Sequence, residues 1–165
     1  RIYPATFPPP LVNFRRASKN MKEKLKRCNC EDIPEDTIHK LAVVLVEDNK
    51  TIVVKKDGLE EFISLGGKHE SSETFQECLQ REAMEELGIV ISNAQFLGRY
   101  QDLTVDTGVP IILDAYLAEA GGEFHPQSEI LEYLWVGRDY ENQGIKLASI
   151  IRLGIIPELI NRNLL

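Results

Sequence analysis

The stretch 66–89 constrains the fold of this 165-residue chain more than any other part of it. Two glycines follow a short apolar run, so we expect a strand to give way to a loop whose backbone can approach a ligand closely. A helix is predicted next, over 75–87, because Thr74 followed by Glu77 forms a capping-box pattern and Gly88 is a typical helix stop. The sequence therefore predicts a strand, a glycine loop and a helix in close succession.

Three glutamates of this predicted helix share one face. With each residue turning about 100°, Glu82, Glu85 and Glu86 fall within an arc about 100° wide. Like charges at this spacing repel each other unless a cation lies over them, and Mg²⁺ or Mn²⁺ suits such a set of oxygen ligands. A solvated acidic face is the alternative. The neighbouring glycines favour a metal and phosphate site. An apolar arc lies beside the glutamates on the predicted helix, and it contains Leu79, Ala83, Met84 and Leu87.

The same stretch resembles the complete Nudix box, G-x5-E-x7-R-E-U-x-E-E-x-G-U, in which U is apolar. Every specified position is matched, by Gly67, Glu73, Arg81, Glu82, Ala83, Glu85, Glu86, Gly88 and Ile89. The resemblance extends more weakly over 38–165. It implies an α/β/α sandwich with a mixed β-sheet, and hydrolysis of a nucleoside diphosphate linked to another moiety with Mg²⁺ or Mn²⁺ as cofactor. One departure is Leu65, because many members have proline there.

The resemblance also implies roles for individual acidic residues. Glu85 and Glu86 would be the main metal ligands, and the Gly66 carbonyl would be a further ligand. Glu82 would bind metal or orient the attacking water, and it is our first candidate for the general base. Glu129 is the rival, because related enzymes often bring an acidic residue from this region to the metals. A surface glutamate is the alternative interpretation of Glu129.

Five further positions are predicted to shape the site or to contact substrate. Arg81 is a catalytic candidate that would act mainly by positioning its neighbours, and Glu73 would do the same. Gly88 has a structural role in ending the helix. Lys68 and Gly67 are predicted to contact substrate phosphate, although an exposed loop lysine is the alternative for Lys68.

The substrate is left open by the residues outside the box. Patterns typical of the coenzyme A, NADH, ADP-ribose and dinucleoside polyphosphate subgroups are missing, which leaves nucleoside triphosphates, including damaged ones, and nucleotide sugars. A non-catalytic, nucleotide-binding regulatory module is an alternative, although such modules usually lose box glutamates. Isopentenyl diphosphate isomerase shares the fold, but its cysteine in a Cys-Ser-His context has no match here.

The composition fits one soluble globular domain. The chain is 43% hydrophobic and 27% charged, and no apolar run is long enough to span a bilayer. Its three cysteines include no Cys-x-x-Cys pair, so neither zinc nor a disulfide framework is indicated, and a cytoplasmic setting is expected. The resemblance also allows a homodimer.

The charge is unevenly distributed along the chain. Residues 1–27 hold eight basic side chains against Glu23 alone, so they carry +7, and residues 28–165 carry −14 within a total of −7. Such a basic arm could bind RNA, which keeps an RNA 5′-end pyrophosphatase as an alternative function. A tail that is solvated or folded on its own acidic domain is the other interpretation. We therefore divide the chain into an N-terminal extension and linker, 1–37, and a Nudix domain, 38–165.

Hydrophobic patterning predicts the remaining elements of the domain. The predicted strands are 41–46, 51–55, 62–65, 89–91 with 94–100, 109–117 and 132–137. The first two are expected to form a hairpin. A polar loop is predicted over 101–108. Two helices are predicted at the C-terminus, over 147–153 and 157–163, with Pro157 at a first helical position.

Overall fold

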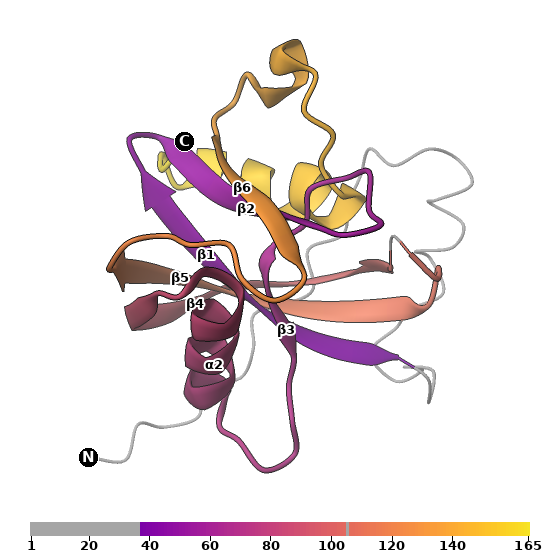
Figure 1. The fold of residues 1–165 in the computed structure, drawn as a ribbon. Coiled ribbons are helices and arrows are strands. Elements are labelled where there is room, and N and C mark those ends of the chain that lie inside the picture. The colour runs from indigo at the N-terminus through magenta and orange to yellow at the C-terminus, as the bar shows by residue number, and fades with distance from the viewer. Residues whose placement is uncertain (1–36, 105) are drawn as a thin grey trace.

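A computed structural model describes residues 37–104 and 106–165 (Figure 1). The predicted N-terminal extension lies outside the described residues, apart from Thr37. The described elements are β1 (Ile38–Glu47), β2 (Lys50–Lys56), β3 (Leu65–Lys68), α2 (Phe75–Leu87), β4 (Val90–Leu103), β5 (Pro110–Gly121), β6 (Ile130–Val136), the 3₁₀ helix η1 (Tyr140–Gln143), the π-helix η2 (Ile151–Ile155) and α3 (Ile156–Asn161). None of the helices in this part of the chain is long and apolar enough to cross a membrane.

Strand β1 is the centre of a mixed six-stranded sheet. The strand order is β4-β5-β1-β2-β6, and β3 pairs with β1 beside this path. Among the described strands, β1 and β5 run parallel, and the other strand pairs are antiparallel. The predicted hairpin of β1 and β2 is confirmed. Its two turn residues, Asp48 and Asn49, have φ of 49° and 58°, as tight hairpin turns require.

Two hydrophobic cores lie on opposite faces of this sheet. Alternate side chains of β1 point to opposite faces, so Leu41 and Val43 pack with α2 while Ala42 and Val44 pack with the C-terminal helices. Figure 1 shows α2 on one side of the sheet and the yellow C-terminal helices on the other. The predicted α/β/α sandwich is confirmed.

Helix α2 begins and ends where its sequence signals predict. Thr74 Oγ1 accepts a hydrogen bond from Glu77 N at 3.2 Å, and Glu77 Oε2 accepts one from Thr74 N at 2.7 Å. Gly88 ends the helix with φ of 69°. Leu79, Ala83 and Leu87 of the apolar arc are buried, whereas Met84 is 43% exposed and lies outside the core.

The two glycines lie in a strand, which corrects the predicted glycine loop. Gly66 pairs with Ala42 and Gly67 pairs with Leu41. Gly66 has φ of 130°, and a Cβ atom there would lie 2.2 Å from the Leu41 carbonyl oxygen. The close approach that requires glycine at 66 is therefore between two strands. The loop starts only after Lys68.

Strand β4 is one long strand, and its pairing with β5 has two register shifts. The predicted break at 92–93 is a register shift between Ser92 and Gln95, where Asn93 has φ of 54°. The strand continues to Leu103, so the predicted polar loop over 101–108 is shorter than expected.

The C-terminal helices are contiguous, although the sequence predicts two separate pieces. The π-helix η2 runs directly into α3, and Ile156 N donates to the Ile151 carbonyl. Pro157 lies in the first turn of α3, where its missing N–H is tolerated. The wider π turn immediately before Pro157 keeps the helical path continuous.

Candidate active site

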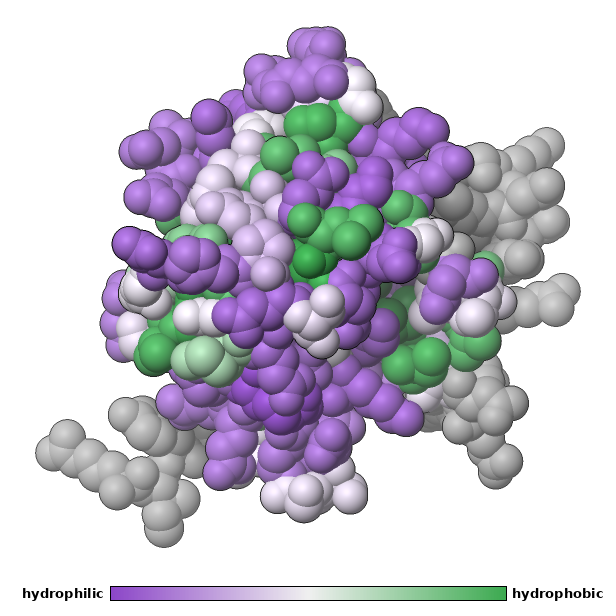
Figure 2. Space-filling view, viewed as in Figure 1, coloured by the Kyte–Doolittle hydropathy of each residue, from purple (hydrophilic) through white to green (hydrophobic). Residues whose placement is uncertain are grey.

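Strand β3 and helix α2 form the floor of the candidate site. Gly66 N donates a hydrogen bond to Glu86 Oε2 at 3.0 Å. A Cβ atom on Gly67 would lie 2.2 Å from Glu82 Oε1, so glycine at this position leaves room for the Glu82 carboxylate. Two helix carboxylates are thereby packed against the strand. Figure 2 shows hydrophilic residues gathered between α2 and β3 on this face of the molecule.

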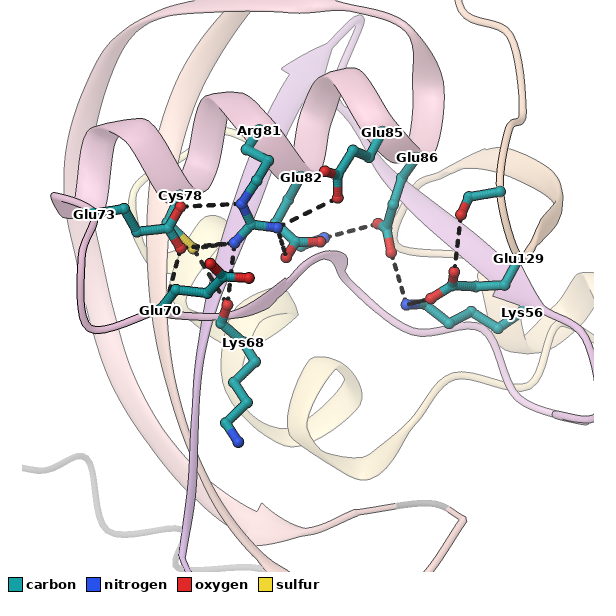
Figure 3. A network of polar contacts seen from close by, with 12 residues as sticks. Lys56, Lys68, Glu70, Glu73, Cys78, Arg81, Glu82, Glu85, Glu86 and Glu129 are labelled. Carbon is teal, nitrogen blue, oxygen red and sulfur yellow. Dashed lines mark hydrogen bonds and ion pairs between the residues drawn. The ribbon is translucent and has the colours of Figure 1, made fainter.

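Arg81 connects most of the acidic side chains predicted from the sequence (Figure 3). Its Nε and Nη2 atoms donate to the two oxygens of Glu73, at 3.0 and 2.6 Å. Its Nη1 atom donates to Glu82 Oε1 at 2.7 Å and to Glu85 Oε2 at 3.3 Å. The hydrogen bonds from Arg81 lower the pKa of Glu73 to about 2, and these carboxylates raise the pKa of Arg81. The guanidinium therefore fixes the carboxylates of the loop and of the helix together.

Lys56 organises a second group of carboxylates next to the first. Its Nζ atom lies 2.7 Å from Glu86 Oε1 and 2.7 Å from Glu129 Oε1. Burial raises the pKa of Glu86, and Lys56 and Gly66 only partly offset this effect. Burial also lowers the pKa of Lys56, but Glu86 and Glu129 outweigh it, so the net shift is upward. The hydrogen bond from Lys56 lowers the pKa of Glu129.

The oxygens around Glu86 have the chemistry that a hard divalent ion requires. Glu86 Oε1 is buried, and although Lys56 forms an ion pair with it, no well-directed hydrogen bond reaches it from the described residues. A buried carboxylate oxygen without a hydrogen bond is costly unless a cation compensates it. Within 37–104 and 106–165, no three His, Cys, Asp or Glu side chains are gathered closely enough to form a ready metal site. The oxygen donors thus fit Mg²⁺ or Mn²⁺, but Lys56 and Arg81 form ion pairs with them.

A sequence model of the NUDIX domain matches residues 37–145. The chain belongs to the Nudix hydrolase family. Its enzymatic class is that of a Nudix pyrophosphohydrolase. No curated protein is significantly similar in sequence.

Several solved structures share this fold. A MutT protein from Methanosarcina mazei Go1 is 16% identical, with a TM-score of 0.65 over 80% of this chain and 99% of its own. The E. coli ORF135 protein is 22% identical, with a TM-score of 0.61 over 78% of this chain and 93% of its own. A MutT NUDIX hydrolase from Burkholderia pseudomallei is 22% identical, with a TM-score of 0.57 over 64% of this chain and 86% of its own. At these identities the likeness establishes the fold alone.

The structure brings most of the predicted Nudix site residues together. Glu82 and Glu85 meet at Arg81, and Lys56 joins Glu86 to Glu129, which comes from the segment before β6. Lys68 contributes only its carbonyl oxygen, which accepts from Arg81 at 3.2 Å. Its side chain extends away from the carboxylates (Figure 3). Substrate contact by Lys68 therefore stays a prediction.

Lys56 is the residue that the sequence analysis missed. On β2, Ile52 and Val54 point toward α2 and are buried. Lys56 follows at the same spacing of two, so its side chain leaves the strand on the same face. The available signal was a lysine on the buried face of an apolar strand. Lysine is rarely buried without a partner, so this position predicts an acidic partner nearby.

A pocket of about 120 Å³ in the Nudix domain includes Lys56 and Gly66, the two residues that contact Glu86. Lys56 and Gly66 line it, together with residues 102–104, Asp106 and the segment 148–150. None of the described residues lining it is aromatic.

Proposed function

We propose that this Nudix protein is a divalent-metal-dependent hydrolase that cleaves the diphosphate linkage of a nucleoside triphosphate, including damaged ones, or of a nucleotide sugar. The observation that carries the proposal is that the pocket and the carboxylates share Lys56 and Gly66. A substrate whose organic part enters the pocket has its phosphates next to Glu86. The matched box and the polar face around α2 support the same orientation.

The metal site we propose consists of oxygen ligands from α2 and β3. Glu85 and Glu86 would be the main ligands, with Glu82 and the Gly66 carbonyl completing the set. When bound, the ion supplies charge neutralisation at the phosphate oxygens and lowers the pKa of a coordinated water. Glu86 is oriented for this role by the Gly66 N–H, and Glu85 by Arg81.

Proton removal from the attacking water is assigned to Glu82. Arg81 binds its Oε1 atom at 2.7 Å, and the missing side chain at Gly67 leaves space around the carboxylate. Glu129 is the second candidate. Its carboxylate also pairs with a cation, Lys56, at 2.7 Å. We prefer Glu82 as base because the family resemblance assigns the attacking water to it, and we assign Arg81 and Glu73 a positioning role.

The test is phosphate and pyrophosphate release from a panel of substrates with Mg²⁺ or Mn²⁺. The panel contains normal and oxidised nucleoside triphosphates, nucleotide sugars, ADP-ribose, dinucleotides and RNA with a 5′-triphosphate. We expect turnover of one class, reduced more than roughly 100-fold by Glu86→Gln, since even changes to residues that support a metal ligand cost 10–100-fold. Glu132→Gln is the matched control, because Glu132 is an exposed glutamate of β6. Binding of nucleotides without turnover of any would contradict the proposal and indicate a regulatory module.

A further inference from the structure

The ion pair between Lys56 and Glu86 is largely buried and lies next to the proposed metal site. Only 19% of the Lys56 side chain and 3% of the Glu86 side chain are exposed. In the described part of the chain, Lys56 is the only cationic side chain that forms an ion pair with Glu86. The buried charge of Glu86 therefore depends on this lysine.

The two oxygens of Glu86 have different partners. Oε2 accepts the hydrogen bond from Gly66 N, whereas Oε1 faces Lys56 Nζ at 2.7 Å. Oε1 is thus the oxygen that remains for a metal ion, and it is also the oxygen that the ammonium contacts. A divalent ion and the ammonium would repel each other if both contacted this oxygen, and the repulsion is strong in a buried site.

We propose that Lys56 is a built-in counter-cation that holds Glu86 and Glu129 together in the metal-free protein and is displaced when a divalent ion binds. This inference rests on the metal site of the proposed function. The ammonium lies between two carboxylates that would otherwise repel each other, and it offsets one of their two negative charges. Metal loading replaces that single charge with a double one.

The surroundings of Lys56 permit this exchange. Lys56 also lines the pocket, so its side chain can leave Glu86 without entering the core. Lys56 contacts Glu86 at a single point, from Nζ to Oε1. Arg81 differs in this respect, because two parallel hydrogen bonds to Glu73 hold it in place.

If the metal ion displaces Lys56, removing the lysine charge by substitution has opposite effects on the metal-free and the metal-bound protein. Removing the lysine charge leaves Glu86 and Glu129 uncompensated, so the metal-free protein becomes less stable. Without the lysine, the metal ion no longer competes with an ammonium for Glu86, so the protein binds the metal ion more tightly. A lysine that only supports the carboxylates would have the other effect, because its removal would weaken metal binding or leave it unchanged.

The experiment compares Mn²⁺ binding by Lys56→Met and by the unmodified full chain after treatment with a chelator. Free Mn²⁺ is measured by electron paramagnetic resonance, and the melting temperature is recorded with and without the ion. We expect Lys56→Met to bind Mn²⁺ at least about tenfold more tightly, which corresponds to about 1.4 kcal/mol, and to melt lower without metal. Lys55→Met is the matched control: Lys55 precedes it on β2 and contacts the Glu60 carbonyl and the Phe62 ring instead.

A second measurement needs no substitution and holds even when Lys56→Met does not fold. Amine acylation of the unmodified protein, followed by peptide mass spectrometry, reports the reactivity of each lysine. We expect acylation of Lys56 to increase several-fold when Mg²⁺ is added, while Lys55 stays constant. Unchanged acylation, or Mn²⁺ affinity that is equal or weaker in a folded Lys56→Met, would overturn the displacement alone. Absence of any Mn²⁺ binding to the unmodified chain would overturn the metal site as well.

Discussion

Arg81 holds Glu73 through two parallel hydrogen bonds, from Nε to Oε2 at 3.0 Å and from Nη2 to Oε1 at 2.6 Å. The same guanidinium reaches Glu82 and Glu85 through its remaining nitrogen. A planar fork with five donors makes these contacts at once, whereas an ammonium is a point charge without this geometry. The spacing of Glu73 and Arg81 in the box therefore lets one guanidinium join the loop to the carboxylates of α2. We call this arrangement the Arg81 clamp.

The first prediction concerns this clamp. Arg81→Lys keeps the charge but loses the fork, so Glu82 and Glu85 are no longer oriented together. We expect kcat to fall roughly 10–100-fold, as when partners of metal ligands are changed. Steady-state kinetics at saturating metal measure the effect. Arg152→Lys, at an exposed position of η2, is the control and should behave like the unmodified enzyme. Equal activity in both variants would contradict a positioning role for Arg81.

The second prediction concerns the space above Gly67. The alanine methyl of Gly67→Ala would collide with the Glu82 carboxylate, while the backbone of Gly67 needs no positive φ. The carboxylate must move, and we expect kcat to fall roughly 10²-fold, since a displacement of about 1 Å at a reacting group has such effects. The melting temperature should change little, because a side chain can shift more easily than a strand.

The control for Gly67→Ala is Gly121→Ala. A Cβ atom on Gly121 meets nothing within 4 Å, and this residue lies at the end of β5. Its activity should remain normal. A Gly67→Ala enzyme with unchanged kcat would show that the position of Glu82 does not limit turnover.

The accuracy of the sequence predictions depended on how local the signal is. The ends of α2 were correct because Thr74, Glu77 and Gly88 cap the helix through contacts within a few residues. The glycine pair was assigned to a loop because its state depends on β1, about 25 residues earlier in the chain, and strand pairing of this kind leaves no local signature. The break in β4 was predicted correctly in place, but its extent was not, since pairing with β5 extends the strand.

In the candidate site, too, contacts within one stretch of sequence were predicted and contacts between distant segments were not. The residues around Arg81 lie in one continuous stretch, so the box alone predicts that they meet. The contact between Lys56 and Glu129 joins segments 73 residues apart, and it requires the antiparallel pairing of β2 and β6. Sequence reasoning found Glu129 only through the resemblance, and it found no partner for it. The cation between the carboxylates became apparent only in three dimensions.

The last prediction concerns Asp114, a buried acidic residue on β5 that is 1% exposed. Arg99 donates to both of its oxygens, at 2.6 and 2.7 Å, and His39 Nε2 lies 2.7 Å from Oδ2. Burial alone would raise the pKa of Asp114, but Arg99 and His39 outweigh it, so the pKa lies below its ordinary value of 3.8. We expect Asp114→Asn to lower the free energy of unfolding by about 2–3 kcal/mol at neutral pH, as for lost hydrogen bonds between charged groups.

The pH dependence of this loss follows from the direction of the pKa shift. Above pH 3.8, Asp114 is ionised in both the folded and the unfolded chain, and its full contribution is present. As the pH falls from there through the lower folded pKa, the unfolded chain binds the proton first, and the contribution disappears. Urea unfolding of Asp114→Asn and of the unmodified protein should therefore differ most near neutral pH and converge in acid. Asp57→Asn, at an exposed turn, should show no such difference. A gap between Asp114→Asn and the unmodified protein that stays constant with pH would mean that Asp114 acts through its shape and not its charge.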